Sequence, residues 1–565
     1  MIKKIIEGKL KALTGVHIGS GVPTETTDLP IYRTAENEIV IPGTAISGAL
    51  RTLATKIAPH FGLAKCLALD ERPTENFCRC PVCDIFGSII LGEDAEKASA
   101  SKIWVSDACL KNGNVKPAIR DGTGIDRETK SSARASRAKY DFEVLPQNSE
   151  FTFRFELRGD ITEENETILA AVLSEWTHGR CYLGGGLARG TGNMQLKELK
   201  VYTLDISSPE KLITFLKEDN PITVASEEID WLDRHVETAK NKIKTIDGGS
   251  YLYNSFARIE FELQFTGGFV INDRLRSTQA GFDFCPYMEA GEFVLPGSSL
   301  RGVLRSHAEK IARTVVTLNC TTGNEFLTSC PACNPHADNK VPLASCNSLL
   351  RKYRKKQQIP PEKEVKEEQL CLACQLFGNS YRGSRLYISD GHLKNAPQLK
   401  IMDFLAIDRF NGGGKEGAKF DALILWKPAF KVRMFFENPK EWELGWLMLV
   451  LRDMRDGLLS VGFGQNKWFG KVELKEENIN VGFISADFAP KCLKISESIK
   501  DVFKTATWNF EELVNVNEPE NPLELWIKDF HDALKHFSRD DNLRPTSDTY
   551  FDGTVEKLYP KEVEL

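Results

Sequence analysis

Alternating apolar and polar residues predict a β-strand near the start of each half of the chain, over residues 1–13 and 259–265. Apolar residues at helical spacing then predict helices over residues 44–57 and 298–316, each beginning at a hydroxyl residue that can cap the first turn. Further strands such as residues 151–157, a second helix and a last strand follow in each half. This order of elements predicts an α+β fold with a ferredoxin-like core.

Short motifs recur in the same order in both halves. IVIPGTAISGALR, from Ile39 to Arg51, is matched by FVLPGSSLRGVLR, from Phe293 to Arg305. A cysteine segment, a Ser-Asp pair, an Ile-Asp-Arg triplet and a glycine loop then follow in each copy, with offsets between 254 and 291 residues over all the matches. We therefore expect a duplicated domain with one insertion in the second copy. The expected units are domains at residues 1–200 and 255–489, a connector at 201–254 and a C-terminal extension at 490–565.

The C-terminal extension contains one strongly amphipathic segment. Six apolar residues fall on one face of a predicted helix: Leu523, Trp526, Ile527, Phe530, Leu534 and Phe537. We expect this helix to dock on its own domain, and a helix that binds a partner is the alternative. The densest basic run, RKYRKK at residues 351–356, is interpreted as a disordered, exposed insertion.

Bulk charge gives no general signal for nucleic acid. Lys and Arg number 73 against 79 Asp and Glu, a formal net charge of −6 over 565 residues, so RNA would have to bind local basic surfaces. The Met-Ile-Lys-Lys start does not open into an apolar signal core, and the longest hydrophobic run, residues 444–451, is too short to span a bilayer. We expect a cytoplasmic protein without membrane contact.

Ten of the 14 cysteines lie in two short windows. Such clusters in a large chain without a secretion signal predict two structural zinc sites, closed because four thiolates fill the tetrahedron. A redox CxxC would not explain why the pairs occur as pairs. In the second window, residues 320–374, the nearby Cys320, Cys346 and His336 remain alternatives. The expected ligands are Cys66, Cys78, Cys80 and Cys83 in the first window, and Cys330, Cys333, Cys371 and Cys374 in the second.

The Pro-Gly motifs place a tight turn at a helix start, where free N–H groups and the helix dipole attract phosphate. A helix that is merely capped is the alternative, but the matched glycine and arginine in both copies favour phosphate binding. The candidate RNA-binding residues here are Gly43, Thr44, Gly48, Arg51, Gly297, Ser298, Arg301 and Arg305.

The glycine loops, LGGGLARGTG and VGFGQNKWFG, precede a strand rather than a helix, which argues against a dinucleotide fingerprint and favours a groove for a polyanion. The residues after each Ile-Asp-Arg triplet are small or basic. Such a segment is typical of a finger that passes between nucleotides, and a solvated surface loop is the alternative interpretation. The candidates from these segments are Gly184, Gly185, Arg189, Gly462, Gly464 and Lys467, with Arg127 and Arg409 in the triplets and Arg134 and Arg137 after the first triplet.

Taken together, TGVHIG, PGTAISGALR, the cysteine cluster ending in IFG, the Ser-Asp pair, GIDR and the LGGG loop resemble the RAMP superfamily. More closely, they resemble the backbone subunits of type III CRISPR effector complexes, and the two fused copies resemble the double-backbone protein of subtype III-D variant complexes. The resemblance implies RNA-recognition-like domains that grip a guide RNA (crRNA), each with a zinc-binding insertion and a thumb hairpin after the Ile-Asp-Arg triplet.

The resemblance also implies one aspartate in the first loop of each copy that cleaves target RNA. Alignment on the Pro-Gly turn assigns Asp28 and Asp283 to this role, with Glu25 and Asp273 as the nearest alternatives. Because the 2′-hydroxyl of RNA is its own nucleophile, the carboxylate can act as a base or can hold Mg²⁺ or another divalent ion. The sequence leaves these two roles open.

We therefore expect a crRNA-binding subunit of an antiviral type III CRISPR effector that works with other subunits and cuts complementary RNA once per domain. A purely structural crRNA-binding subunit is the main alternative. A guide-processing endoribonuclease is the third possibility, and it would use a histidine such as His60 or His307.

Overall fold

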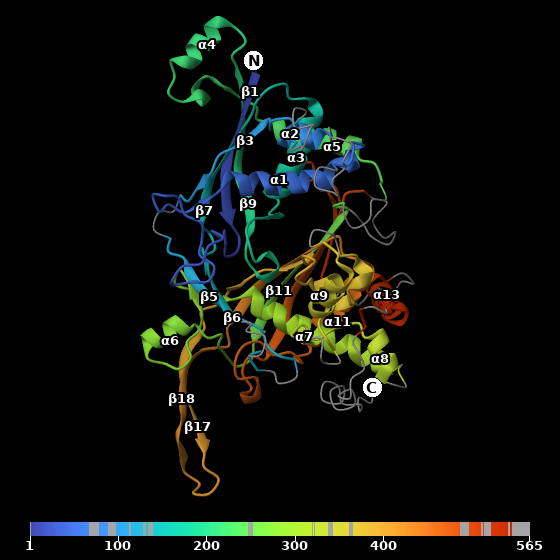
Figure 1. Ribbon diagram of the computed structural model, residues 1–565. Coiled ribbons are helices and arrows are strands. Elements are labelled where there is room, and N and C mark those ends of the chain that lie inside the picture. Colours follow the sequence, from blue (N-terminus) through green and yellow to red (C-terminus); the bar gives the residue numbers. More distant parts are fainter. Residues whose placement is uncertain are drawn as a thin grey trace.

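Two antiparallel sheets, each with helices on one face, form the body of the protein in the computed structural model (Figure 1). No helix among the described residues is both long and apolar enough to cross a bilayer. The structure describes residues 2–66, 78, 80–88, 98–111, 115–127, 131–133, 139–246, 252–318, 320, 323–336, 343–360, 365–485, 496–509, 512, 521–540 and 543–544.

The first sheet has the ferredoxin-like strand order, with β1 and β7 as the two central strands. The strands run β9-β1-β7-β3, every neighbouring pair is antiparallel, and two short strands add to β9. Helices α1 (Gly43–Ile57) and α3 (Glu163–Thr177) bury their apolar faces in the same core as the sheet. The strands are β1 (Ile2–Ala12), β3 (Ile103–Val105), β7 (Glu150–Leu157), β8 (Cys181–Tyr182), β9 (Asn193–Asp205) and β10 (Ser226–Glu227).

The second sheet repeats this topology. Its central order is β20-β11-β19-β15, and α7 (Gly297–Leu318) and α11 (Glu441–Arg455) pack into its core. The duplicated α+β fold expected from the sequence is thus confirmed. The strands are β11 (Ser255–Phe265), β13 (Met288–Glu289), β14 (Glu292–Leu295), β15 (Leu386–Ile388), β16 (Gly391–Leu393), β19 (Ala429–Glu437), β20 (Val472–Phe483) and β21 (Lys504–Asn509).

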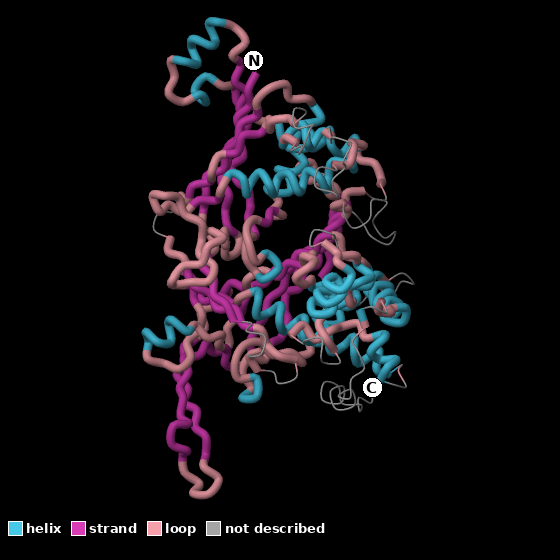
Figure 2. Tube along the Cα trace, in the orientation of Figure 1, coloured by secondary structure: helices cyan, strands magenta, loops and turns pink. Residues whose placement is uncertain are grey.

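A β-hairpin follows the Ser-Asp pair in each copy and carries the Ile-Asp-Arg triplet near its tip. The first hairpin, β5 (Ala118–Thr123) with β6 (Lys139–Val144), lies against the second half of the chain. The second, β17 (Gln398–Ile407) with β18 (Gly414–Trp426), projects away from the body (Figures 1 and 2). The two hairpins are therefore equivalent in topology but differ in surroundings.

Helices also occupy the connector and the extension. The connector contains α4 (Pro209–Leu216) and α5 (Trp231–Lys242), and the extension contains α13 (Pro522–His536). Helix α13 docks on α11, where the ring of Phe530 stacks on Trp446 with centroids 5.2 Å apart. The expectation that the amphipathic helix covers its own domain is confirmed.

The basic run at residues 351–356 is not a disordered insertion. It belongs to α9 (Cys346–Gln357), which buries Leu349, Leu350 and part of Arg354. The prediction was wrong because it considered the charge of the run alone. Leu349 and Leu350, directly before the run, anchor the helix. The remaining elements are α2 (Pro81–Phe86), α6 (Arg274–Ala280), α8 (Gly323–Ser329), α10 (Leu372–Phe377), β2 (Val40–Ile41), β4 (Ala108–Cys109) and β12 (Gly268–Phe269).

Candidate RNA-binding and cleavage site

Both candidate catalytic aspartates lie in the long loop after the first strand of their copy, beside the middle of the hairpin. Each carboxylate is exposed and makes the same contact. The N–H of Asp28 donates to Asp141 Oδ1 at 2.8 Å, and the N–H of Asp141 donates back to Asp28 Oδ2 at 3.1 Å. Asp283 and Asp421 make the equivalent pair, at 2.9 Å in both directions. The two copies therefore present one aspartate pair each, built from the loop and from the returning strand of the hairpin.

In each copy the residue before the second aspartate of the pair is aromatic, and its ring lies near a cation. In the first copy the guanidinium of Arg189 lies 5.4 Å from the ring centre of Tyr140, and in the second the ammonium of Lys467 lies 5.8 Å from that of Phe420. Tyr140 and Phe420 directly precede the second aspartate of each pair. Aromatic faces and cations are what single-stranded RNA needs for base stacking and phosphate contact.

The glycine loops hold these cations in place. The loop of the first copy is anchored where the N–H of Gly185 donates to His17 O at 2.8 Å, and the N–H of Phe463 donates to Val270 O at 3.0 Å in the second. Gly184 and Gly462 share a φ of 93°. Both loops therefore have the same shape, and each presents its cation beside the hairpin.

The glycine loop of the first copy also touches the second copy. A Cβ on Gly190 would lie 2.2 Å from Asp390 Oδ1 and 2.9 Å from the Cα of Gly297, so only glycine fits there. From the first hairpin, Arg120 forms a bidentate ion pair with Asp390 and also contacts Glu289. We call this set of contacts the joint between the two copies.

At each Pro-Gly turn, one of the N–H groups that the sequence suggested for phosphate binding is already occupied. The N–H of Gly43 donates to Asp107 Oδ1 and that of Gly297 to Asp390 Oδ1, both at 2.7 Å. These aspartates belong to the repeated Ser-Asp pair, so that motif closes the turn. The predicted cap at Thr44 is also wrong, because α1 begins after Pro42 without a side-chain cap. Thr44 and Gly48 remain exposed on the outer face of α1.

The arginines of these helices point inward. Arg51 donates to Cys83 Sγ at 3.6 Å and Arg305 donates to Cys374 Sγ at 3.5 Å, so the matched arginines contact the cysteine clusters. Arg301 bonds only carbonyl oxygens, those of Leu386 and Phe377. Burial, with the like charges of Arg305 and Arg189, lowers the pKa of Arg301 to about 9. Arg305 also forms an ion pair with Glu309, with 2.8 Å between Nε and Oε1, whereas Arg301 has carbonyl partners alone among the described residues.

The arginines in and after the triplets have different surroundings. Arg127 forms an ion pair with the buried Glu309 of α7, with 2.8 Å between Nε and Oε2, so it belongs to the joint. Arg409 is exposed at the tip of the second hairpin. Arg134 and Arg137 lie outside the described residues. Ser298 is half-buried in the first turn of α7, and Gly464 begins the one-turn helix that carries Lys467.

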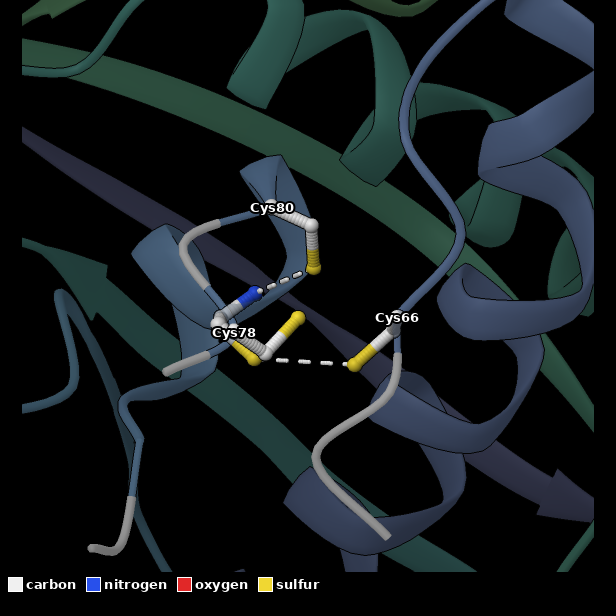
Figure 3. A group of neighbouring side chains, drawn as sticks. Cys66, Cys78 and Cys80 are labelled. Atoms are coloured by element: carbon white, nitrogen blue, oxygen red, sulfur yellow. Dashed lines mark hydrogen bonds between the residues drawn. The ribbon is translucent and has the colours of Figure 1, made fainter. Parts of the chain in front are cut away.

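The first cysteine cluster fits zinc. The sulfur atoms of Cys66, Cys78, Cys80 and Cys83 all lie within 4.8 Å of one another, and Figure 3 shows the labelled thiols turned toward a common point. Cys66 Sγ and Cys83 Sγ are 3.5 Å apart, close to the ~3.8 Å edge of a tetrahedral zinc–thiolate site. Hydrogen bonding to Cys66 and Cys80, with burial, raises the pKa of the Cys83 thiol, so a cation is needed to keep all four sulfurs ionised.

The second cluster corrects one predicted ligand. Cys333, Cys346, Cys371 and Cys374 have ligand atoms within 4.8 Å of one another, so Cys346 stands where the sequence suggested Cys330. The thiol of Cys330 instead donates to Ala332 O at 3.1 Å. Cys346 opens α9, and its N–H donates to Cys333 Sγ at 3.4 Å. Zinc in either cluster would stiffen the insertion without an open coordination position.

Two functional features could have been found in the sequence. The second aspartates stand in KYDFEVL and KFDALIL, a repeat at the offset of the other landmarks. The spacing of Cys333 and Cys346 is also close to that of Cys66 and Cys78, with 12 and 11 intervening residues. The ion pair of Arg120 had no such signal, because Met402 replaces this arginine in the second copy.

Comparison with known proteins agrees with the duplicated site. The profile of the RAMP superfamily matches residues 9–195 and 289–473. A protein of Enterococcus italicus named CRISPR system Cms endoribonuclease Csm3 is 27% identical over 212 residues, which are 34% of this chain and 90% of the relative.

Proteins with the same name in two other organisms are similar. The one from Streptococcus thermophilus is 24% identical over 36% of this chain and 94% of its own length. The one from Methanocaldococcus jannaschii is 26% identical over 35% of this chain and 80% of its own length. Each relative is matched over most of its length by about a third of this chain, as a single copy would be. The chain therefore belongs to the RAMP superfamily and carries two copies of its domain.

Proposed function

We propose that this protein is a crRNA-binding backbone subunit of a type III CRISPR effector complex and cuts complementary target RNA once in each copy. It would act in the cytoplasm with other effector subunits. We assign the copies to residues 1–200 and 255–489, joined by the connector at 201–254 and followed by the extension at 490–565. Support comes from membership of the RAMP superfamily and from relatives that are named CRISPR endoribonucleases.

The observation that carries the proposal is the equivalent placement of Asp28 and Asp283. Both are exposed, and each pairs with an aspartate in the returning strand of a hairpin, directly after an aromatic residue whose ring lies near a cation. An RNA backbone splayed across the hairpin would bring a 2′-hydroxyl in line with the adjacent phosphate. Cleavage then needs mainly this geometry and compensation of the negative charge on the phosphate. The aspartate would take the proton or hold Mg²⁺ or another divalent ion beside the phosphate.

The guide-loaded complex with end-labelled complementary RNA and Mg²⁺ tests the proposal. Two cuts are expected for the unaltered chain, and Asp28→Ala should remove one while guide binding stays intact. Asp283→Ala, the matched variant, should remove the other. Loss of both cuts from one substitution would contradict independent sites, and cutting that persists in EDTA would contradict a divalent ion.

A structural subunit without cleavage activity is the second candidate, because the glycine loops and the joint have architectural roles of their own. That candidate predicts bound crRNA and no fragments in the same assay. A guide-processing activity has less support. His60 is buried, and Nε2 of His307 lies 2.7 Å from Asp453 Oδ2 on α11.

A further inference from the structure

The second aspartate of each pair, Asp141 or Asp421, has no role in the function proposed above. Each comes from the returning strand of a hairpin, 113 or 138 residues after its partner in the sequence. The pairing is reciprocal, since each aspartate donates its N–H to the carboxylate of the other. A single Asx turn would need only one of these bonds and no second segment.

Each aspartate pair lies at the start of a short parallel β-contact between the loop and the returning strand of the hairpin. Leu29, next to Asp28, forms a bridge with Phe142, and Phe284, next to Asp283, forms the same bridge with Ala422. Glu143 N–H donates to Leu29 O at 3.0 Å, which continues the contact in the first copy. The loop is therefore fixed at the aspartate, and the fixed point recurs in the second copy although the surrounding residues differ.

The hydrogen bonds also set the direction of the catalytic carboxylate. Oδ2 of Asp28 accepts the N–H of Asp141, so its torsion angle is restrained and Oδ1 is left without a partner among the described residues. The same holds for Asp283 Oδ1, since Oδ2 accepts the N–H of Asp421. A carboxylate on a long loop, residues 13–39 in the first copy, would otherwise sample many orientations.

We propose that Asp141 and Asp421 are positioning residues: their side chains lock the loop, and the locked loop holds the carboxylates of Asp28 and Asp283 against the main-chain N–H groups that aim them at the RNA backbone. The inference rests on the proposed cleavage function and deepens it. Positioning requires only a hydrogen-bond acceptor at the side chain of Asp141, not its charge. An amide oxygen can accept the N–H of Asp28 equally well, because asparagine has the same size and the same acceptor geometry.

The test compares three changes in the guide-loaded complex and follows the two cuts separately, so that the untouched copy serves as the internal control. Asp141→Ala should slow the first cut about 100-fold, the effect of a misplaced catalytic group, and should leave the second unchanged. Asp141→Asn should keep the first cut within about threefold of the unaltered rate. Asp421→Ala should act in the same way on the second cut only.

Guide binding and the melting temperature of each variant separate a positioning defect from misfolding, since neither should change. The inference is overturned if Asp141→Ala cuts as fast as the unaltered chain. It is also overturned if Asp141→Asn is as slow as Asp141→Ala, because the charge would then be required, as in a shared metal ion. A chain with no cuts at all would remove the proposed function and this inference together, whereas the other outcomes leave the function standing.

Discussion

Two arginines at equivalent positions have a role that differs from the one their sequence context suggests. A helix start with a Pro-Gly turn and an arginine two turns later is typical of a phosphate site, yet Arg51 and Arg305 both donate to a cysteine sulfur. Four thiolates around Zn²⁺ carry a net charge of −2, so a nearby guanidinium stabilises the loaded cluster. The repeated arginine thus joins the first helix of each copy to its cysteine insertion.

This contact predicts a site-specific loss of zinc. Arg51→Ala should weaken zinc binding at the first cluster about 10-fold, the usual effect of removing an outer-shell hydrogen bond, and should leave the second cluster unchanged. A chelator titration followed by metal analysis would resolve the two ions per chain. Arg305→Ala is the matched control and should reverse the order in which the ions leave; equal weakening of both clusters by either change would refute the assignment.

At the scale of elements, one pair of acids makes the docking of α13 sensitive to pH. Glu441 in the first turn of α11 hydrogen-bonds Asp529 of α13, and this bond, with burial and the charge of Asp529, raises the pKa of Glu441 to about 7 from 4.5. The protonated form donates the hydrogen bond, and the ionised form repels Asp529. Protonation of this one side chain therefore favours the docked helix.

The sign of the pH dependence follows from the raised pKa. The stabilisation is fully present below about pH 4.5, the unfolded-state value, and is lost as the pH rises through about 7. We expect the melting temperature of the unaltered chain to fall relative to that of Glu441→Gln between pH 6 and pH 8, because the amide keeps a donor at every pH. A constant difference between the two proteins across this range would disprove the role of Glu441.

The elements themselves were largely predictable, and their surroundings were not. Strand alternation gave β1 and β11, and the Pro-Gly motif gave the start of α1 and α7, because these signals are local. The ion pair of Arg127 was not predictable, since its partner Glu309 lies 182 residues away in the sequence, on the other copy. The prediction of the fourth ligand of the second cluster was wrong for a different reason, because three neighbouring residues offered a suitable atom and the spacing of Cys66 and Cys78 was not used to choose among them.

At the scale of the whole molecule, the joint makes the two copies one unit. Arg120 is 2% exposed, and its two partners, Asp390 and Glu289, are as deeply buried. A buried ion pair adds little over an apolar contact, but removing one member leaves unpaired charges in the interior. The glycine loop and Arg127 add contacts at the same boundary. Relative motion of the two copies is therefore costly.

Arg120→Ala should separate the copies without unfolding either. The two stranded carboxylates should cost ~3–5 kcal/mol, visible as a second transition at lower denaturant concentration and as a larger radius of gyration in solution scattering. The control is Arg154→Ala, which removes a half-exposed pair with Glu7 and should cost less than ~1 kcal/mol. Equal losses of unfolding free energy in the two variants would show that the ion pair at the joint stabilises the protein no more than a surface pair does.

The residues that close the joint inside the chain are absent from the outer end of the second copy. Where the first copy has Gly190, the second has Trp468, 78% exposed with a φ of 62°, and where the first has Arg120, the second has Met402. A tryptophan cannot enter a space in which a single Cβ would already collide. Head-to-tail contacts that repeat without closing grow into filaments. Trp468, in place of the glycine, prevents a further contact of the same kind after the one between the two copies. The number of copies in one unit, and with it the number of cuts under the proposed function, would thus be fixed by the chain and not by assembly.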